Sequence, residues 1–246
     1  MAKLGEIDYI RRAGPKEREH ILNKPFSEPM CGYLLSDIGT IMRLLPAPPA
    51  TLLDLGAGSG WTSCLFALTG YQVTAQDISP DMVELIELNK KRYGATMLTP
   101  IVSDYESLDF DEEFDCAVFY DSLHHAEEEH AALTSVYRAL KPNGVVITAE
   151  PGTGQSQTPE ALRAVQEFGV TEKDMPVAAV IATAEKIGFR CTGVFERRFE
   201  PKPLIHAETL RTYRGAYGFI SASLREMSWR LKGGHLTEGH YVVLQK

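Results

Sequence analysis

The stretch TLLDLGAGSGW, residues 51–61, carries an acid and a glycine-rich turn directly after a strand-like apolar run. Asp54 precedes glycines at alternate positions, Gly56, Gly58 and Gly60, which let the backbone turn sharply and let a ligand approach it closely. The dinucleotide fingerprint GxGxxG would need a glycine where Trp61 stands, and the Gly-Lys-Ser/Thr of a P-loop is absent. An acid beside the loop is a poor neighbour for pyrophosphate and a good one for an ammonium group. The loop therefore predicts a ligand that is not rich in phosphate.

Two further acids follow the next two strand-like runs. Asp77 lies near the end of YQVTAQDI, 17 residues after Gly60, where a carboxylate can accept two hydrogen bonds from a ribose diol. Asp104 ends ATMLTPIVSD, where it could meet an exocyclic amine. Acids at three successive strand ends, around one glycine loop, predict a pocket for a cationic nucleoside that bears an amino acid. S-adenosylmethionine (SAM) has that chemistry.

The elements that position these acids alternate between strand and helix from residue 51 onward. Helical segments carry clear end signals, such as Ser79 and Pro80 at a start and Gly94 at a stop. Short apolar runs, typical of buried parallel strands, lie between them: ATLLDLG, YQVTAQDI, ATMLTPIVSD, FDCAVFYDS, GVVITAEP and, at the end, HYVVLQK. The alternation predicts a doubly wound parallel sheet with its ligand beyond the carboxyl ends of the strands.

Composition limits the classes of protein that fit. The chain has 246 residues and a net charge of −8, which favours one α/β domain and argues against a general nucleic-acid binder. Four scattered cysteines without a CxxC pair are typical of a reducing compartment. No apolar run approaches the roughly 18 residues of a membrane span. We therefore expect a cytoplasmic protein, monomeric or homodimeric, that binds neither nucleic acid nor membrane.

Five successive blocks resemble the ordered motifs of class I SAM-dependent methyltransferases: LLDLGAGSGW, TAQDISPDMV, VSDYESLDF, FDCAVFYDSLHH and RALKPNGVVITAEP. The resemblance implies a single methyltransferase domain over residues 1–246, with a Rossmann-like, mostly parallel sheet of seven strands. Residues 1–50 would form a helical N-terminal cap and residues 51–150 the SAM-binding core. Residues 200–237 would form a helical cap insertion before the last strand.

The same resemblance implies a set of cofactor contacts at the strand ends. The glycine loop, with Gly56, Ala57, Gly58 and Gly60 and with Asp54 beside it, would meet the methionine moiety and ribose. Asp77 would bind the ribose hydroxyls, and Ile78 and Met82 would pack against the adenine. Asp104 would meet the adenine amino group, Tyr105 would meet the ring through its backbone, and Tyr120 and Asp121 at the fourth-strand tip would lie beside the donor methyl.

Candidate catalytic bases follow the fourth strand in YDSLHHAEEEH. A neutral histidine can accept a proton near pH 7, so His124 or His125 could act as the base, or could equally brace the loop. His124 is preferred because it lies nearer the strand end. Glu150 is a second candidate base, or a cap for a backbone turn. A metal site from His124, Glu128 and His130 fits no known ligand spacing, so no metal is expected.

The acceptor should be selected by the irregular parts of the chain. Residues 197–232 hold eight Lys or Arg against three acids, which predicts either a solvated basic face or a cap in which Arg211 or Arg214 meets an anionic acceptor. The flanking segments resemble bacterial methyltransferases associated with glycan or secondary-metabolite assembly. That resemblance implies a hydroxyl of a sugar or natural product as acceptor, in a site lined by Phe26 and Tyr33.

Three alternative functions remain beside a small-molecule O-methyltransferase. A small-molecule N-methyltransferase would use the same fold, although the NPPY-type sequence of enzymes that methylate nucleobases is replaced by YDSL. A SAM-binding module without catalysis is disfavoured by the intact acids at the strand ends. A nicotinamide-dependent dehydrogenase is disfavoured by Trp61 and by the GxGxG spacing.

Overall fold

The computed structural model describes residues 2–197, 224 and 239–246. The predicted substrate contacts Arg211 and Arg214, with nearly all of the predicted helical insertion, lie outside these described residues. The strands are β1 (Thr51–Leu55), β2 (Gln72–Asp77), β3 (Leu98–Val102), β4 (Phe114–Tyr120), β5 (Leu140–Glu150), β6 (Arg190–Glu196) and β7 (His240–Gln245). The α-helices are α1 (Ala2–Ala13), α2 (Pro15–Leu22), α3 (Cys31–Leu44), α4 (Trp61–Leu68), α5 (Pro80–Tyr93), α6 (Glu129–Ala139), α7 (Pro159–Phe168) and α8 (Val177–Ile187).

The strands form one sheet in the order β3-β2-β1-β4-β5-β7-β6. β7 is antiparallel to both β5 and β6, and the other paired strands are parallel. The predicted mostly parallel seven-stranded sheet is therefore confirmed. The strand order reverses between β1 and β4, and in such sheets the loops on either side of the reversal diverge and leave a crevice beyond the carboxyl ends.

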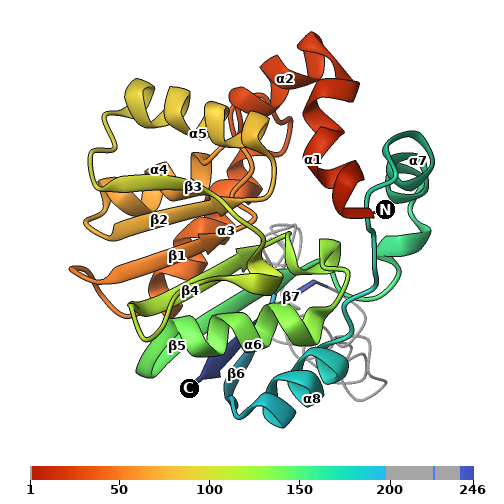
Figure 1. Ribbon diagram of the computed structural model, residues 1–246. Coiled ribbons are helices and arrows are strands. Elements are labelled where there is room, and N and C mark those ends of the chain that lie inside the picture. Colours follow the sequence, from red (N-terminus) through yellow and green to blue (C-terminus); the bar gives the residue numbers. More distant parts are fainter. Residues whose placement is uncertain (1, 198–223, 225–238) are drawn as a thin grey trace, which may run out of the picture.

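Successive strand residues point to opposite faces of the sheet, and both faces are covered by helices (Figure 1). Leu52 of β1 packs in the core that also contains buried residues of α3, α4 and α5. Its neighbour Leu53 packs in the core on the other face, with buried residues of α6 and α8. This burial on both faces explains why the strand sequences read as continuous apolar runs.

The start of α5 differs in detail from the sequence prediction. Ser79 stands at the N-cap position and Pro80 follows it, as predicted, but the Ser79 side chain makes no cap hydrogen bond. Its hydroxyl instead donates to the Ile7 carbonyl of α1 at 2.8 Å. The residue that reads as a local cap therefore joins the N-terminal helix to the sheet. At its other end α5 stops at Gly94, which has the left-handed conformation of a C-cap.

The first helix lies across the carboxyl end of the sheet, between α5 and α7 (Figure 1). Gly5 of α1 approaches the backbone of Gly169 so closely that a β-carbon on Gly5 would stand 2.3 Å from the Gly169 carbonyl oxygen. Lys3 pairs with Asp104 and Glu106, just past the end of β3. These contacts close one side of the crevice with α1.

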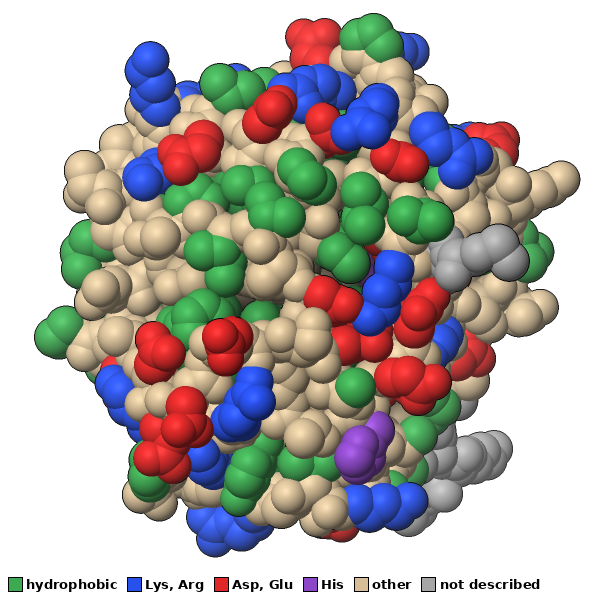
Figure 2. All heavy atoms as spheres, in the orientation of Figure 1, with side chains coloured by type: hydrophobic (Ala, Val, Ile, Leu, Met, Phe, Trp, Pro, Cys, Tyr) green, Lys and Arg blue, Asp and Glu red, His purple; other side chains and the backbone are tan. Residues whose placement is uncertain are grey.

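The surface carries both signs of charge. Figure 2 shows acidic and basic side chains lying close together over the face that it presents, so that opposite charges neutralise one another locally. Among the described residues, no helix combines the length and the apolar character that spanning a membrane would need.

Two glycines with the same backbone conformation test how tightly the glycine loop packs. Gly60 and Gly94 have φ of 70° and 65°, but a β-carbon on Gly60 would lie 2.7 Å from Ile86 Cγ2, whereas one on Gly94 would meet nothing within 4 Å. In both alanine variants the left-handed conformation should lower the free energy of unfolding by about 1–2 kcal/mol. In Gly60→Ala we expect overpacking to lower it by about 1–3 kcal/mol more. Urea unfolding would measure both losses, and equal losses would contradict the close packing against Ile86.

Candidate functional site

Three cavities open beyond the carboxyl ends of the strands, where the strand order reverses. The first cavity, about 290 Å³, is lined by residues that include Gly56, Asp77, Ile78, Met82, Tyr105 and His125. The second cavity, about 270 Å³, is lined by residues that include Asp54, Ala57, Gly58, Trp61, Met82 and Tyr120. The third cavity, about 860 Å³, is lined by residues that include Met30, Tyr33, His124, Gln155, Thr158 and Arg197.

The glycine loop is fixed against the second strand by its own backbone N–H groups. Gly58 donates to Asp77 Oδ2 at 2.8 Å, and Ser79 donates to Asp77 Oδ1 at 2.9 Å. Burial raises the pKa of Asp77 to about 6, although these two hydrogen bonds favour the carboxylate. Each carboxylate oxygen accepts one of these bonds and keeps a further lone pair, which a ligand in the first cavity can use. Asp77 thus lines the first cavity, and its contact with a ribose diol stays a prediction.

Gly58 provides a direct test of whether the loop can cradle a ligand. A β-carbon on Gly58 would meet no atom within 4 Å, so the space above this residue is open. Gly58 lines both the first and the second cavity. The open space fits a ligand that presses against the loop and extends between the two cavities.

Asp54 lies under the loop and is buried. It accepts hydrogen bonds from the hydroxyls of Thr62 and Ser63, at 2.7 and 2.5 Å, at the start of α4. Burial raises its pKa, and these two hydroxyls oppose the rise. Asp54 also lines the second cavity. Its Oδ2 therefore braces the turn into α4, and the residue contributes an acid to the cavity wall.

The predicted adenine contacts separate into two groups. Ile78, Met82 and Tyr105 line the first cavity, and the Tyr105 hydroxyl donates to the Ser122 carbonyl at 3.0 Å. Asp104, in contrast, is not part of that lining. Its carboxylate accepts from the Glu106 backbone and from Lys3 Nζ. In this conformation Asp104 fixes α1 and the turn after β3, and its contact with an adenine amino group stays a prediction.

Asp121, at the tip of β4, lines all three cavities. Its φ of 47° is uncommon for a residue other than glycine, and it brings the carboxylate against Arg197. Both Asp121 oxygens accept from this guanidinium, one of them at 2.6 Å. The predicted position of Asp121 beside the reacting centre stays a prediction, and the structure shows that the cavities converge on this residue.

Arg197 joins the β4 tip to helix α3 through a second acid. Its Nε and Nη2 lie 2.8 and 2.7 Å from Oδ2 of Asp37, and both side chains are almost completely buried. Asp37 also accepts from the hydroxyls of Tyr120 and Tyr241. The acids raise the pKa of Arg197 further, although burial opposes the rise, so the guanidinium stays charged. Tyr120, predicted beside the donor methyl, lines the second cavity and is held by this cluster.

The two adjacent histidines have different partners. His124 is buried, with Nδ1 2.7 Å from Glu150 Oε2 and Nε2 3.6 Å from Glu172 Oε2. Glu150 is completely buried, and its other oxygen accepts from the Leu123 backbone at 2.9 Å. Glu150 therefore orients His124, which lines the third cavity. Of the two ring nitrogens of His124, Nδ1 thus faces Glu150 and Nε2 faces Glu172.

His125 lines both the first and the third cavity. Its Nδ1 lies 2.6 Å from the Thr171 carbonyl and 3.4 Å from Glu6 Oε1. Burial alone would lower the pKa of His125, but the contact with Glu6, its charge and that of Glu172 raise it to about 9. His125 is therefore protonated near neutral pH.

The predicted acceptor contacts are only partly brought together. Tyr33 lines the third cavity, whereas Phe26 is 65% exposed and is not among the lining residues. Arg211 and Arg214 lie outside the described residues, so their roles stay predictions. Arg197, from the same basic segment, does line the third cavity, but two acids already neutralise it.

Several residues at the site carried no usable signal in the sequence. Asp37 lies in the middle of an amphipathic helix, and Glu172 lies in an irregular segment. Glu6 and Tyr9 of α1 line the first cavity, far from the glycine loop in the sequence. Each is placed by long-range packing, which no local pattern encodes.

The chain is similar to known methyltransferases over part of its length. Residues 53–148 match the family model of the methyltransferase domain. The chain is 30% identical over 118 residues to the demethylmenaquinone methyltransferase of Clavibacter sepedonicus, covering 47% of this chain and 47% of that protein. It is 29% identical over 156 residues to the cypemycin N-terminal methyltransferase of a Streptomyces species, covering 61% of each. The chain thus spans about half to three fifths of the length of these curated relatives.

A solved structure extends the likeness to the whole described fold. The phosphoethanolamine N-methyltransferase 2 of Haemonchus contortus, in complex with S-adenosyl-L-methionine, superposes with a TM-score of 0.67 at 20% identity. The superposition covers 100% of this chain and 60% of that chain. At this identity the likeness establishes a shared fold.

The charge state of Asp77 should control cofactor affinity. Above about pH 6 both carboxylate oxygens can accept from a ribose diol, whereas below it one of them carries a proton. We therefore expect affinity for S-adenosylhomocysteine (SAH) to fall as the pH drops through about 6. Asp77→Asn should weaken binding by about 1.5–3 kcal/mol and remove this pH dependence. Calorimetric titration between pH 5 and 8 would measure both effects, and parallel pH curves for the two proteins would contradict the assignment.

Removal of Arg197 should destabilise the fold. Arg197→Ala leaves the buried Asp37 carboxylate without its cation, which should lower the free energy of unfolding by about 3–5 kcal/mol. Arg163→Ala is the matched control, because Arg163 pairs with Glu167 on the exposed face of α7 and should change stability by no more than about 0.5 kcal/mol. Urea unfolding of both variants provides the comparison. Equal stabilities would show that the cluster around Arg197 does not support the fold.

The order of the strands, the motif blocks between residues 50 and 150 and the family match over residues 53–148 all agree. The glycine loop and Asp77 also provide the open space and the acceptor oxygens that a nucleoside needs. Residues 53–148 thus match the methyltransferase domain, and together these findings support a class I SAM-dependent methyltransferase with SAM as its cofactor.

Proposed function

We propose that this protein transfers the methyl group of SAM to a hydroxyl of a small molecule bound in the third cavity. The observation that carries the proposal is the meeting of the cavities at Asp121 and His125. Asp121 lines all three cavities, and His125 lines the first and the third. A cofactor along the glycine loop and an acceptor in the third cavity would therefore approach each other at this junction.

The cofactor would occupy the first and second cavities together. Asp77 would hold the ribose hydroxyls, and Ile78 and Met82 would pack against the adenine. The methionine end would then lie in the second cavity, beside Asp54 and Tyr120. Several acids around these two cavities favour a ligand with positive charge, and both the sulfonium and the ammonium group of SAM provide it.

The third cavity suits an acceptor that has both an apolar face and hydroxyl groups. Met30 and Leu34 form an apolar wall, whereas Thr153, Gln155 and Thr158 supply polar side chains. A sugar ring or a hydroxylated natural product presents this combination. The acceptor class is thus proposed from the cavity lining together with the resemblance of the flanking segments.

SAM supplies an electrophilic methyl group, so that transfer forms a carbon–oxygen bond while the carbon–sulfur bond breaks and its electron pair stays on sulfur. The protein holds the reacting groups in line, which can lower the barrier by roughly 7–11 kcal/mol. The hydroxyl proton must also leave, and we assign it to Nε2 of His124. Glu150 holds the ring by Nδ1 and stabilises the imidazolium that results. His125 is a poorer base near neutral pH because it already carries a proton.

The test is an acceptor screen with methyl-labelled SAM, in which SAH formation and the methylated atom are both determined. The screen should contain sugars, nucleotide sugars, phenolic natural products and small amines. We expect turnover with a hydroxyl acceptor and a kcat that falls by about 10²- to 10⁴-fold in His124→Gln. SAH binding by His124→Gln should remain, because His124 does not line the first or the second cavity.

His130→Gln is the matched control, because His130 is an exposed residue of α6 and lines none of the three cavities. Its kcat should equal that of the wild type. Methylation of nitrogen alone, or full activity of His124→Gln, would overturn the proposal. In the first case the small-molecule N-methyltransferase would replace it, since a neutral amine needs no general base to attack the methyl group.

A further inference from the structure

The segment between α7 and α8 has no regular secondary structure, yet it is tied to several elements around the histidines. We call residues 171–174 the strap. The Thr171 carbonyl accepts from Nδ1 of His125 at 2.6 Å, and the Thr171 N–H donates to Glu6 Oε1 of α1 at 2.8 Å. One residue of the strap thus joins a histidine beside β4 to the N-terminal helix.

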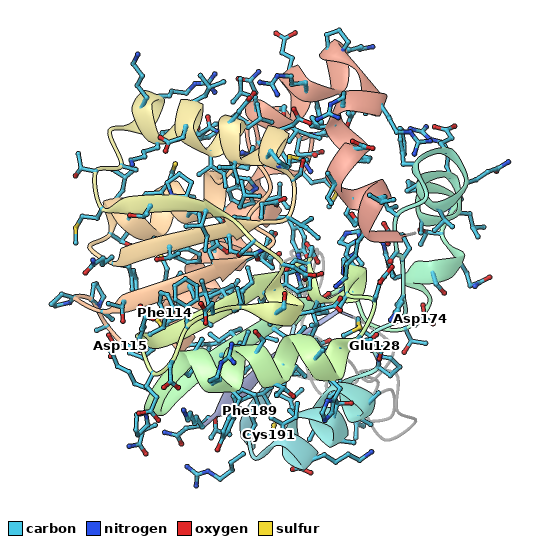
Figure 3. All side chains as sticks on the ribbon, in the orientation of Figure 1. Phe114, Asp115, Glu128, Asp174, Phe189 and Cys191 are labelled. Carbon is cyan, nitrogen blue, oxygen red and sulfur yellow. The ribbon has the colours of Figure 1, made fainter. Side chains whose placement is uncertain are left out.

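The other end of the strap is anchored to α6 and to the loop after β5. Lys173 Nζ pairs with Glu129 Oε1 at 2.9 Å, and Asp174 Oδ1 accepts from the Ser156 backbone at 2.9 Å. Figure 3 labels Asp174 and Glu128 on the same side of the molecule, beside the N-terminal end of α6. The hydrogen bonds from Ser156 and Gly154 also lower the pKa of Asp174. The strap is therefore held by contacts at both of its ends.

Glu172 is the strap residue whose side chain turns toward the histidines. Its Oε2 lies 3.6 Å from Nε2 of His124 and accepts from Gln155 Nε2 at 3.2 Å. The Glu172 side chain is only 11% exposed. On the other side of the same imidazole, Glu150 faces Nδ1 at 2.7 Å. The ring of His124 thus lies between two carboxylates that come from distant parts of the chain.

We propose that Glu172 is a positioning residue for proton removal, held by the strap opposite Glu150 across the imidazole of His124. This inference rests on the proposed methyl transfer to a hydroxyl. As the new carbon–oxygen bond forms, the hydroxyl proton moves to Nε2 of His124 and the ring becomes a cation. A carboxylate at each ring nitrogen then stabilises that cation, while a neutral ring gains much less from the second carboxylate.

Glu172 also separates the roles of the two histidines. The charged groups that face His125 are Glu6 from α1, Glu172 from the strap and Asp77 from β2. Burial would lower the pKa of His125, but the contacts and charges of Glu6 and Glu172 raise it to about 9. His125 therefore keeps its proton near neutral pH, and the proton from the acceptor goes to His124.

A divalent metal is the competing occupant of this cluster. His124, His125 and Glu172 can each offer a ligand atom, and the three atoms lie within 4.8 Å of one another. The two imidazoles are tilted against each other, with centroids 4.1 Å apart and planes inclined by 38°. Elemental analysis of the purified protein separates a metal site from two imidazoles that are stabilised by carboxylates.

The experiment compares Glu172→Gln with Glu185→Gln in the full chain. Glu185 is an exposed residue of α8 and lines none of the three cavities, so it controls for the loss of one acid. Ring signals of His125 are followed by NMR against pH, without any acceptor present. In the wild type the midpoint should lie at about 9, and in Glu172→Gln it should move to lower pH. Glu185→Gln should titrate like the wild type.

Turnover provides the second readout, with the hydroxyl acceptor found in the screen. We expect kcat of Glu172→Gln to fall at least about tenfold, but less than the 10²- to 10⁴-fold expected for loss of the base itself. KM for SAM should change little, and Glu172→Asp should restore part of kcat because it restores the charge.

Two results would overturn the inference. The first is an unchanged His125 titration together with a wild-type kcat in Glu172→Gln. The second is one equivalent of divalent metal in the purified wild type, measured by elemental analysis and lost in Glu172→Gln, which would make these side chains ligands. Absence of turnover with every hydroxyl acceptor would count against the proposed function instead, and the NMR titration would still decide the placement of Glu172.

Discussion

A buried guanidinium needs anions beside it, and this requirement organises the site end of the molecule. Arg197 follows β6, and it satisfies its charge with Asp37 of α3 and Asp121 at the tip of β4. An isolated charge at this depth would be strongly unfavourable, so neither acid can move away without loss of stability. Because Asp121 lines all three cavities, the same constraint fixes the position at which those cavities meet. An ion cluster thus determines the relative placement of α3, β4 and the final hairpin of the sheet.

The buried carboxylates at the strand ends also need partners, and theirs are hydrogen-bond donors. Asp77 accepts from backbone N–H groups, and Asp54 accepts from two hydroxyls of α4. Glu150 is satisfied by the Leu123 N–H and by His124. In each case the partners come from the next turn or from a neighbouring strand end, so the parallel sheet itself supplies them. Such preorganised acids need little rearrangement when a cationic ligand binds.

The sequence predicted the parts of the structure whose causes are local. The apolar runs, the glycine loop and Asp77 depend on residues within a few positions of one another, or on a regular strand–helix alternation. Asp104 shows the limit of that reasoning, because its place at the end of β3 followed from the pattern but its pairing with Lys3 did not. Phe26 was expected in the site and is exposed, since the course of the segment between α2 and α3 depends on tertiary packing. Asp37 and Glu172 had no local signal, because their partners are distant in the sequence.

The cofactor cavities and the third cavity are lined by different parts of the chain. The cofactor side of the site is built largely by residues 53–148, which match the family model, and its acids sit at strand ends that the fold places in the same way. The walls of the third cavity come mostly from other segments, including the start of α3, the loop after β5 and Arg197. The curated relatives match this chain over 39–61% of its length, so their likeness bears chiefly on the core. Under the proposed function, the acceptor would be selected by these flanking segments, and the contacts of the strap and of the Arg197 cluster hold them against the core.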